Sequence, residues 1–287
     1  PLMKLNSLDF VLALLLTAGG FVSTTGATEG EARLALAPAG ATYVGDARCA
    51  SCHITPNNQY VHTVHANAFK LNPRNEAEKH GCESCHGPGA KHSADADNPA
   101  NRGSIVSFTR EWGTPVQKQN ELCMTCHRGG QRNLWSGSVH AINRLGCSDC
   151  HNPMANFSAH GLLKAGSIAE TCYSCHPQQR AEFARRSHMP VPEGKMTCVD
   201  CHNPHGSSTK PLLKADSVNE TCYACHAEKR GPFIWEHAPV RENCLNCHNA
   251  HGSNNEKLLQ VSRPYNCQRC HGNPNHPSTL YNAGQRV

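Results

Sequence analysis

The residues of this chain that could do chemistry are its cysteines, and all 18 of them fall in the pattern CxxCH. The pattern is typical of c-type haem attachment, because two thiols add to the haem vinyl groups and the adjacent histidine reaches the iron from one face. The predicted thioether cysteines are Cys49, Cys52, Cys82, Cys85, Cys123, Cys126, Cys147, Cys150, Cys172, Cys175, Cys198, Cys201, Cys222, Cys225, Cys244, Cys247, Cys267 and Cys270. The predicted proximal iron ligands are His53, His86, His127, His151, His176, His202, His226, His248 and His271. The sequence therefore predicts nine covalently bound haem c groups.

Zinc sites and disulfides also use closely spaced cysteines. Zinc sites contain CxxC pairs, but they do not require a histidine directly after the second cysteine. Histidine makes up 20 of the 287 residues, so chance does not place one after all nine CxxC pairs. Nine disulfide loops meet the same objection, and the spacing favours haem over both alternatives.

Histidines outside the motifs recur at characteristic distances from them. Some follow 11 to 13 residues after a motif, and others follow three to six residues after one. We predict that these are distal iron ligands: His65, His92, His140, His188, His205, His237, His251 and His276. His62 and His80 fall outside this register, and no ligand role is predicted for them.

The fourth motif departs from its copies. The sixth and eighth motifs read CVDCHNPHG and CLNCHNAHG, with a histidine three residues after CxxCH, whereas the fourth reads CSDCHNPMANFSAHG. Met154 therefore occupies the histidine position, and His160 follows six residues later. Either residue could be the distal ligand. A His/Met haem would have a higher potential than its bis-histidine neighbours.

Composition limits the protein core. Aromatic residues make up 6% of the chain and hydrophobic residues 38%, with the cysteines included, so haem plates must replace much of the usual apolar core. The formal charge of +5 suggests an acidic partner, but two propionates on each haem would reverse this charge. No nucleic-acid partner is therefore predicted.

The N-terminus predicts export. Residues 3–27 resemble a secretory signal peptide, with Lys4 before an apolar stretch from Phe10 to Val22 and small residues before Ala27. A single membrane anchor is the alternative, although the stretch is short for one. Export fits haem attachment, which takes place outside the cytoplasm, and it predicts a periplasmic location.

The chain repeats itself about every 50 residues. GLLKAGSIAETCYSCH matches PLLKADSVNETCYACH, and the sequence after each also matches, so one unit carries two haems. Residues 28–48 form a leader, and the predicted units are 49–122 for haems 1–2 with long loops, 123–171 for haems 3–4, 172–221 for haems 5–6, 222–266 for haems 7–8, and 267–287 for haem 9 with a truncated end.

Secondary structure is expected to be sparse. The 18 prolines and 23 glycines interrupt the chain often, and no alternating run predicts a sheet. Short helices are expected at the motifs and at NELCMTCH, PQQRAEFARRS and HAEKRGPFIWEH, with irregular loops at 54–81 and 87–122. The predicted fold is an elongated multihaem cytochrome c, mostly irregular, with short α-helices and essentially no β-sheet.

Three segments carry a family resemblance. GCESCHGPGAKH, CHAEKRGPFIWEHAPVRENCLNCHNAHGS and CQRCHGNPNHPS resemble the periplasmic decahaem cytochromes of the DmsE/MtrA type. The resemblance implies a slender wire of bis-histidine haems inserted in an outer-membrane β-barrel porin, passing electrons between periplasm and cell exterior. It also implies a periplasmic or inner-membrane cytochrome as donor or acceptor, and an extracellular multihaem cytochrome as a further partner. This chain departs from the family in lacking a tenth CxxCH and in carrying Met154.

The predicted function is electron transfer without catalysis, of the kind used in extracellular metal respiration or Fe(II) oxidation. Six-coordinate haems leave no position for a substrate, so they carry electrons. A soluble periplasmic shuttle or electron store would share all these motifs. A multihaem enzyme of the nitrite or hydroxylamine type is the less favoured alternative, because no CxxCK motif is present.

Overall fold

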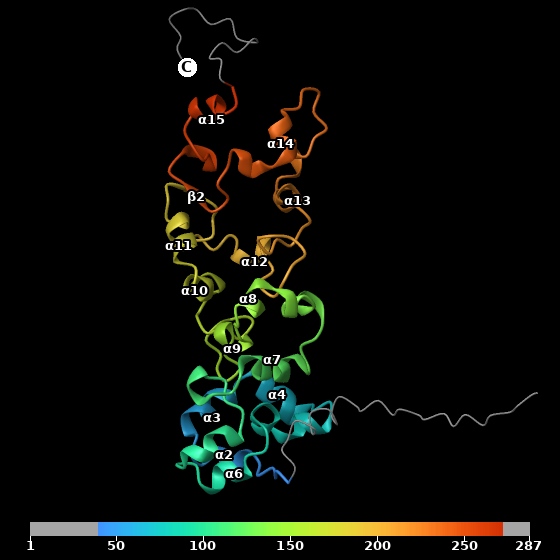
Figure 1. The fold of residues 1–287 in the computed structure, drawn as a ribbon, viewed down its shortest axis with the longest axis vertical. Helices are drawn as coiled ribbons and strands as arrows, with labels where there is room; N and C mark the ends of the chain where they lie inside the picture. The colour runs from blue at the N-terminus through green and yellow to red at the C-terminus, as the bar shows by residue number, and fades with distance from the viewer. Residues whose placement is uncertain (1–39, 272–287) are drawn as a thin grey trace, which may run out of the picture.

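The computed structural model describes residues 40–271, which form an elongated body of short helices joined by irregular segments (Figure 1). The chain progresses along the long axis, with α2 and α6 at one end, α7 and α9 near the middle and α15 at the other end. The predicted signal peptide, most of the leader and His276 lie outside the described residues.

Residues 40–115, which we call the N-terminal lobe, contain more helix than expected. The elements are α2 (Asp46–Ala50), α3 (Ile54–Tyr60), α4 (Val64–Leu71), η1 (Glu76–His80), α5 (Glu83–His86), α6 (Ala90–Ala94), η2 (Pro99–Ser104) and η3 (Arg110–Trp112). The expectation of irregular loops at 54–81 and 87–122 is therefore wrong. Capping residues explain part of the difference: Thr63 accepts the Ala66 N–H at the start of α4, and Asn75 accepts the Glu78 N–H at η1.

Residues 116–271, which we call the repeat region, consist of short helices that recur with the motifs. The elements are α7 (Val116–Met124), η4 (Gly130–Arg132), η5 (Trp135–Gly137), α8 (Val139–Ile142), α9 (Cys147–Cys150), α10 (Ile168–Tyr173), α11 (Pro177–Phe183), β1 (Ser187–His188), α12 (Cys198–Cys201), α13 (Val218–Tyr223), η6 (Ala227–Lys229), α14 (Ala238–Glu242), η7 (Cys244–Asn246), β2 (Gly252–Ser253), η8 (Glu256–Leu258) and α15 (Tyr265–Gln268). Serine caps begin two equivalent helices, because Ser167 accepts the Glu170 N–H and Ser217 accepts the Glu220 N–H.

Two of the three helices expected from specific sequences are present. NELCMTCH lies largely in α7, and PQQRAEFARRS contains α11. HAEKRGPFIWEH is the exception, because its helical part is limited to the single 3₁₀ turn η6. Gly231 has a positive φ of 86° and precedes Pro232, and both residues oppose continuation of a helix.

Sheet structure among residues 40–271 is minimal, as predicted. Strand β1 pairs antiparallel with β2, with Ser187 opposite Ser253 and His188 opposite Gly252. The mostly irregular fold with short helices is confirmed.

The interior has few apolar side chains. The buried hydrophobic residues of the described region are Tyr60, Ala77, Val106, Ala155, Phe183, Val191 and Leu213. Seven such side chains are too few to hold more than 230 residues by apolar burial alone, so another group must fill the spaces between the short elements. None of the helices within residues 40–271 combines the length and apolar character needed to cross a membrane.

Candidate haem-binding sites

Each CxxCH motif is wound into one helical turn. In all nine motifs the histidine N–H donates to the carbonyl of the first cysteine at 2.9–3.1 Å. Residues three and four apart on a helix lie on the same side, so the turn gathers both thiols and the imidazole at one place. This arrangement is what two thioethers and one axial ligand to a single haem require.

The fourth, sixth and eighth motifs share a hairpin that orients the histidine ring. In each hairpin the ring Nδ1 lies within hydrogen-bond distance of a later backbone oxygen: His151 with Gly161 at 2.6 Å, His202 with Pro211 at 2.8 Å, and His248 with Lys257 at 2.8 Å. A hydrogen bond from Nδ1–H leaves Nε2 as the nitrogen that binds a metal. The hairpin therefore presets both the tautomer and the ring direction.

In the second motif, a distant residue orients the histidine ring. His86 Nδ1 lies 2.8 Å from the carbonyl oxygen of Val106, which is 20 residues further along the chain. The Phe108 ring packs edge-on against the same imidazole, with ring centres 5.4 Å apart. A loop of the N-terminal lobe here takes the place of the local hairpin.

The first cysteines of successive motifs lie in contact. Their side chains form four pairs: Cys49 with Cys82, Cys123 with Cys147, Cys172 with Cys198, and Cys222 with Cys244. Burial raises the pKa of Cys150 and of Cys201, and the charge of a second cysteine across the boundary, Cys175 or Cys225, raises it further, so second cysteines of neighbouring pairs lie within electrostatic range. Neighbouring attachment sites therefore follow one another closely along the body.

Histidine rings face one another in pairs that join separate parts of the chain. The ring centres lie 6.2 Å apart in His53–His92, 5.8 Å in His65–His127, 6.3 Å in His140–His176, 6.1 Å in His151–His205, 6.2 Å in His202–His251 and 6.1 Å in His237–His271. Each pair consists of one motif histidine and one predicted distal histidine. Two imidazoles on opposite sides of one metal ion, each bound at about 2 Å, have ring centres about 6 Å apart. The paired rings thus fit a haem iron between them.

Three of the predicted distal ligands have a buried ring nitrogen without a partner. In His65, His92 and His205, the Nδ1 atom has no hydrogen-bond partner among the described residues. Burial also lowers the pKa of these three imidazoles, most directly by removing water from the charged form. A neutral imidazole is the form that binds a metal.

Other distal rings are held by contacts that motif spacing does not reveal. His140 Nδ1 lies 2.8 Å from the Pro204 carbonyl oxygen, 64 residues away. His251 Nδ1 lies 3.0 Å from a carboxylate oxygen of Glu182, which is buried on α11. These partners orient the ligands, and no local sequence signal identifies them.

The remaining predicted ligands are not placed in facing ring pairs. His188 Nε2 lies 2.9 Å from a carboxylate oxygen of Glu193, and His276 lies outside the described residues. Met154 is half-buried, with its N–H donated to Asn152 Oδ1 at 3.0 Å, whereas His160 is exposed. Of the two histidines outside the register, His80 stacks on Tyr43 with ring centres 3.8 Å apart, and His62 is exposed.

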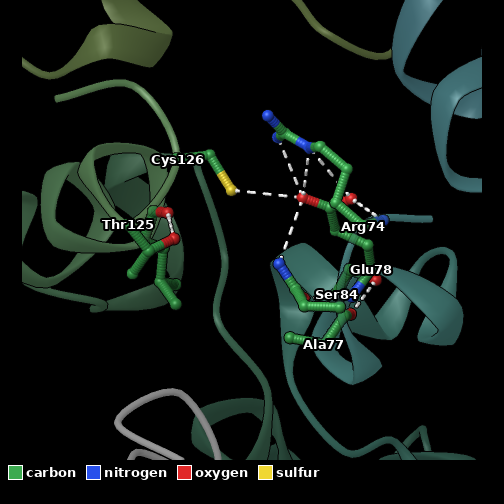
Figure 2. A network of polar contacts seen from close by, with 8 residues as sticks. Arg74, Ala77, Glu78, Ser84, Thr125 and Cys126 are labelled. Carbon is green, nitrogen blue, oxygen red and sulfur yellow. Dashed lines mark hydrogen bonds and ion pairs between the residues drawn. The ribbon is translucent and has the colours of Figure 1, made fainter. Parts of the chain in front are cut away.

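Glu78 links the N-terminal lobe to the third motif (Figure 2). Its carboxylate, 1% exposed, accepts the Arg74 backbone N–H at 2.7 Å and the Arg74 Nη2 at 2.9 Å, and it lies 3.8 Å from Cys126 Sγ. Burial disfavours the charged form, but the hydrogen bonds and the charge of Arg74 outweigh it and lower the pKa of Glu78. No sequence pattern singles out this residue, because a glutamate in a spacer carries no motif.

Comparisons with known proteins agree with this geometry. The doubled CXXCH motif family matches residues 188–231 and 237–276, and the NrfB-like cytochrome c-type family matches residues 82–168. The multiheme cytochrome MtrA of Shewanella baltica is 44% identical over 200 residues, which cover 70% of this chain and 58% of that protein. The cytochrome c-type protein NrfB of Escherichia coli is 29% identical over 140 residues, covering 47% and 67%. The C-type polyheme cytochrome OmcC of Geobacter sulfurreducens is 25% identical over 236 residues, covering 72% and 26%.

The fold, the attachment turns and the paired rings define a multihaem c-type cytochrome with covalently bound haem. Within this class the chain is similar to MtrA, the type that its sequence motifs resemble. It spans 58% of the length of the Shewanella protein that it matches.

Proposed function

We propose that the protein carries nine haem c groups in a line and conducts electrons along its length, between the periplasm and the cell exterior. The observation that carries this proposal is the succession of attachment sites along the elongated body (Figure 1). Cysteine pairs join neighbouring motifs within the predicted units, and closely placed second cysteines join one unit to the next.

The residues of this chain determine what such haems can do. A haem would supply one-electron redox chemistry, and the facing histidines would occupy both ligand positions of its iron. The carbonyl oxygens of Gly161, Pro211 and Lys257 hold three of the motif rings in place, so little structural change accompanies electron transfer. With both positions filled, the sites favour electron transfer over substrate conversion.

The proposed surroundings are an outer-membrane β-barrel porin into which the slender body inserts from the periplasm. The similarity to MtrA supports this placement, as does a body whose described part is long and narrow. A periplasmic or inner-membrane cytochrome exchanges electrons at one end, and an extracellular multihaem cytochrome at the other. The direction of flow depends on these partners.

The test is reconstitution of transmembrane electron transfer. The full chain is co-expressed with a candidate outer-membrane barrel, the complex is purified, and it is inserted into liposomes that hold a reduced redox dye. We expect an external oxidant to oxidise the trapped dye through the complex but not through the barrel alone. A complex that forms and fails to oxidise the dye contradicts the conduit, and a chain that does not co-purify with a barrel indicates a periplasmic shuttle.

A pair of substitutions separates conduction from assembly. His205→Ala removes the ring that faces His151 in the middle of the line, and it should slow dye oxidation at least about tenfold, because the iron of this haem loses its paired ligand. His62→Ala changes an exposed histidine outside the ligand register and should leave the rate unchanged. Intact mass gives the number of haems in each protein, and a mass below nine haems would overturn the count.

A further inference from the structure

Met154 occupies a position whose structural equivalents are both histidines that face a motif histidine. Each of the three hairpins begins with an asparagine whose Oδ1 accepts an N–H two residues later. The pairs are Asn152 with Met154 at 3.0 Å, Asn203 with His205 at 3.2 Å and Asn249 with His251 at 3.3 Å. Met154 therefore leaves the backbone at the same point of the same turn as His205 and His251.

The two equivalent histidines follow one rule in choosing their partner. His205, after the sixth motif, faces His151 of the fourth motif at 6.1 Å. His251, after the eighth motif, faces His202 of the sixth motif at 6.2 Å. Each reaches back to the motif two places earlier. Applied to the fourth motif, the rule directs Met154 to His86 of the second motif.

The contacts of the hairpins with earlier segments follow the same rule. The sixth-motif hairpin donates from Asn203 Nδ2 to the Gln131 carbonyl at 2.9 Å, just after the third motif. The eighth-motif hairpin places the Gly252 carbonyl 3.1 Å from Arg185 Nη1, after the fifth motif. The fourth-motif hairpin donates from Asn156 Nδ2 to the His62 carbonyl at 2.7 Å, after the first motif. All three hairpins thus lie against the segment that follows the motif three places earlier.

This contact places the Met154 hairpin against the segment that contains Tyr60, two residues before His62. Burial raises the pKa of Tyr60, and the charges of Cys85 and Cys82 of the second motif raise it further, so this segment lies within electrostatic range of that motif. Among residues 40–271, the motif histidines His86, His226 and His248 have no facing histidine ring of the kind that His205 presents to His151. Of these three, His86 is the one to which the hairpin rule directs Met154, and Met154 offers a thioether.

His160 belongs to the other side of the hairpin. The next residue, Gly161, supplies the carbonyl that holds His151, as Pro211 and Lys257 do for their histidines. His160 therefore corresponds to Lys210 and Glu256, the residues before these carbonyls, and all three are exposed. Its position matches surface residues and not ligands.

We propose that Met154 is the distal axial ligand of the haem attached through Cys82 and Cys85, opposite His86, and that this haem has His/Met coordination. This inference rests on the proposed electron-transfer function and assigns a role to one site within it. A thioether favours reduced iron more than an imidazole does, so methionine raises the reduction potential. An electron moving along the line therefore rests preferentially on the second haem, near the end formed by the N-terminal lobe.

Spectroscopy of the ferric holoprotein tests the ligand directly. We expect one equivalent of the near-infrared charge-transfer band of His/Met haem in the wild type, and its loss in Met154→His. His160→Ala is the matched control and should keep the band. A wild type without the band, a band that survives Met154→His, or a band lost in His160→Ala overturns the proposal.

A second substitution tests which haem is involved. His205→Met introduces a thioether opposite His151, and it should double the band, because Met154 serves a different haem. If Met154 instead bound the haem of His151, the band would stay at one equivalent. Redox titration gives an independent readout. In the wild type, about one ninth of the haem absorbance should titrate at a higher reduction potential than the rest. In Met154→His, the potential of this step should fall into the range of the other haems.

The liposome assay separates this inference from the proposed function. A wild-type protein that oxidises the dye but lacks the band contradicts Met154 ligation and leaves the conduit in place. A band that behaves as expected without dye oxidation contradicts the conduit and leaves the ligand assignment in place. Intact mass confirms that each variant carries the full set of haems before either assay.

Discussion

The second motif orients its histidine ring by contacts different from those used in the fourth, sixth and eighth motifs. In the repeat region, a local hairpin of nine or ten residues supplies the carbonyl that holds each motif histidine. In the N-terminal lobe, the carbonyl comes from Val106, and the motif itself is held by Glu83, a buried carboxylate within it. Its oxygens accept N–H groups from Val44, Gly45 and Gly89. The repeat region therefore orients these motif histidines with a local hairpin that recurs, whereas the N-terminal lobe does so with contacts between distant segments.

The largest effect is expected from Glu83→Ala, which removes the carboxylate that holds the second motif in the N-terminal lobe. Three backbone N–H groups lose a charged acceptor, so unfolding free energy should fall by about 3–5 kcal/mol. Guanidinium denaturation of the holoprotein, followed by circular dichroism, measures this change. Val199→Ala alters the equivalent position of the sixth motif and should cost about 1 kcal/mol or less. Equal losses in the two variants would remove the distinction between lobe and repeat.

Gly206→Ala perturbs the sixth-motif hairpin of the repeat region. Gly206 has a φ of 128°, and a Cβ there would overlap the backbone carbonyl of Leu134, so we expect a loss of about 3 kcal/mol. Gly194→Ala is the matched control, because Gly194 also has a positive φ, of 68°, but has open space around it. Its cost should be limited to the left-handed strain of about 1–2 kcal/mol. A similar loss in both variants would show that packing on Leu134 contributes nothing.

Glu78→Gln tests the N-terminal lobe through the pH dependence of its stability. The variant keeps the shape but loses the charge that Arg74 stabilises, and it should cost about 1–2 kcal/mol at neutral pH. Because the folded-state pKa of Glu78 lies below its ordinary value of 4.5, the advantage over glutamine is present above pH 4.5 and is lost as pH falls through the folded-state pKa. Denaturation curves at several pH values check this trend.

The control for Glu78 lies in the same 3₁₀ turn. Glu76 pairs with Lys79, and both side chains are exposed, so Glu76→Gln should change stability by less than about 0.5 kcal/mol at any pH. A pH-independent cost of Glu78→Gln would mean that the charge does not contribute.

The last comparison is between two copies of the hairpin. Asn203 accepts the His205 N–H and donates to the carbonyls of Gly206 and Gln131, so Asn203→Ala should cost about 2 kcal/mol. Asn152→Ala removes the bond to the Met154 N–H and should cost about 1 kcal/mol. Denaturation of the two holoprotein variants measures the difference, and a larger loss in Asn152→Ala would contradict it.

Motif spacing predicted the attachment sites, because covalent chemistry fixes the order Cys, Cys, His within five residues. The resemblance, the scarcity of sheet and the short helices were also predictable from the sequence. The partner of each ring was not, because it depends on how segments pack: His65 faces His127 and His205 faces His151, and no local pattern encodes either choice. The helices of the 54–81 spacer were missed because their capping residues are single polar side chains, which also occur in loops.

The contact between first cysteines bears on how the protein is assembled. Before a haem is attached, Cys172 and Cys198 are free thiols, and the fold places their side chains within hydrogen-bonding reach. In an oxidising compartment such a pair is readily converted to a disulfide, which would consume one thiol from each of two motifs and block both. The few buried apolar side chains also leave little to hold the chain before the haems arrive. Attaching haem to an extended, reduced chain, with folding as the last step, would avoid this loss of thiols.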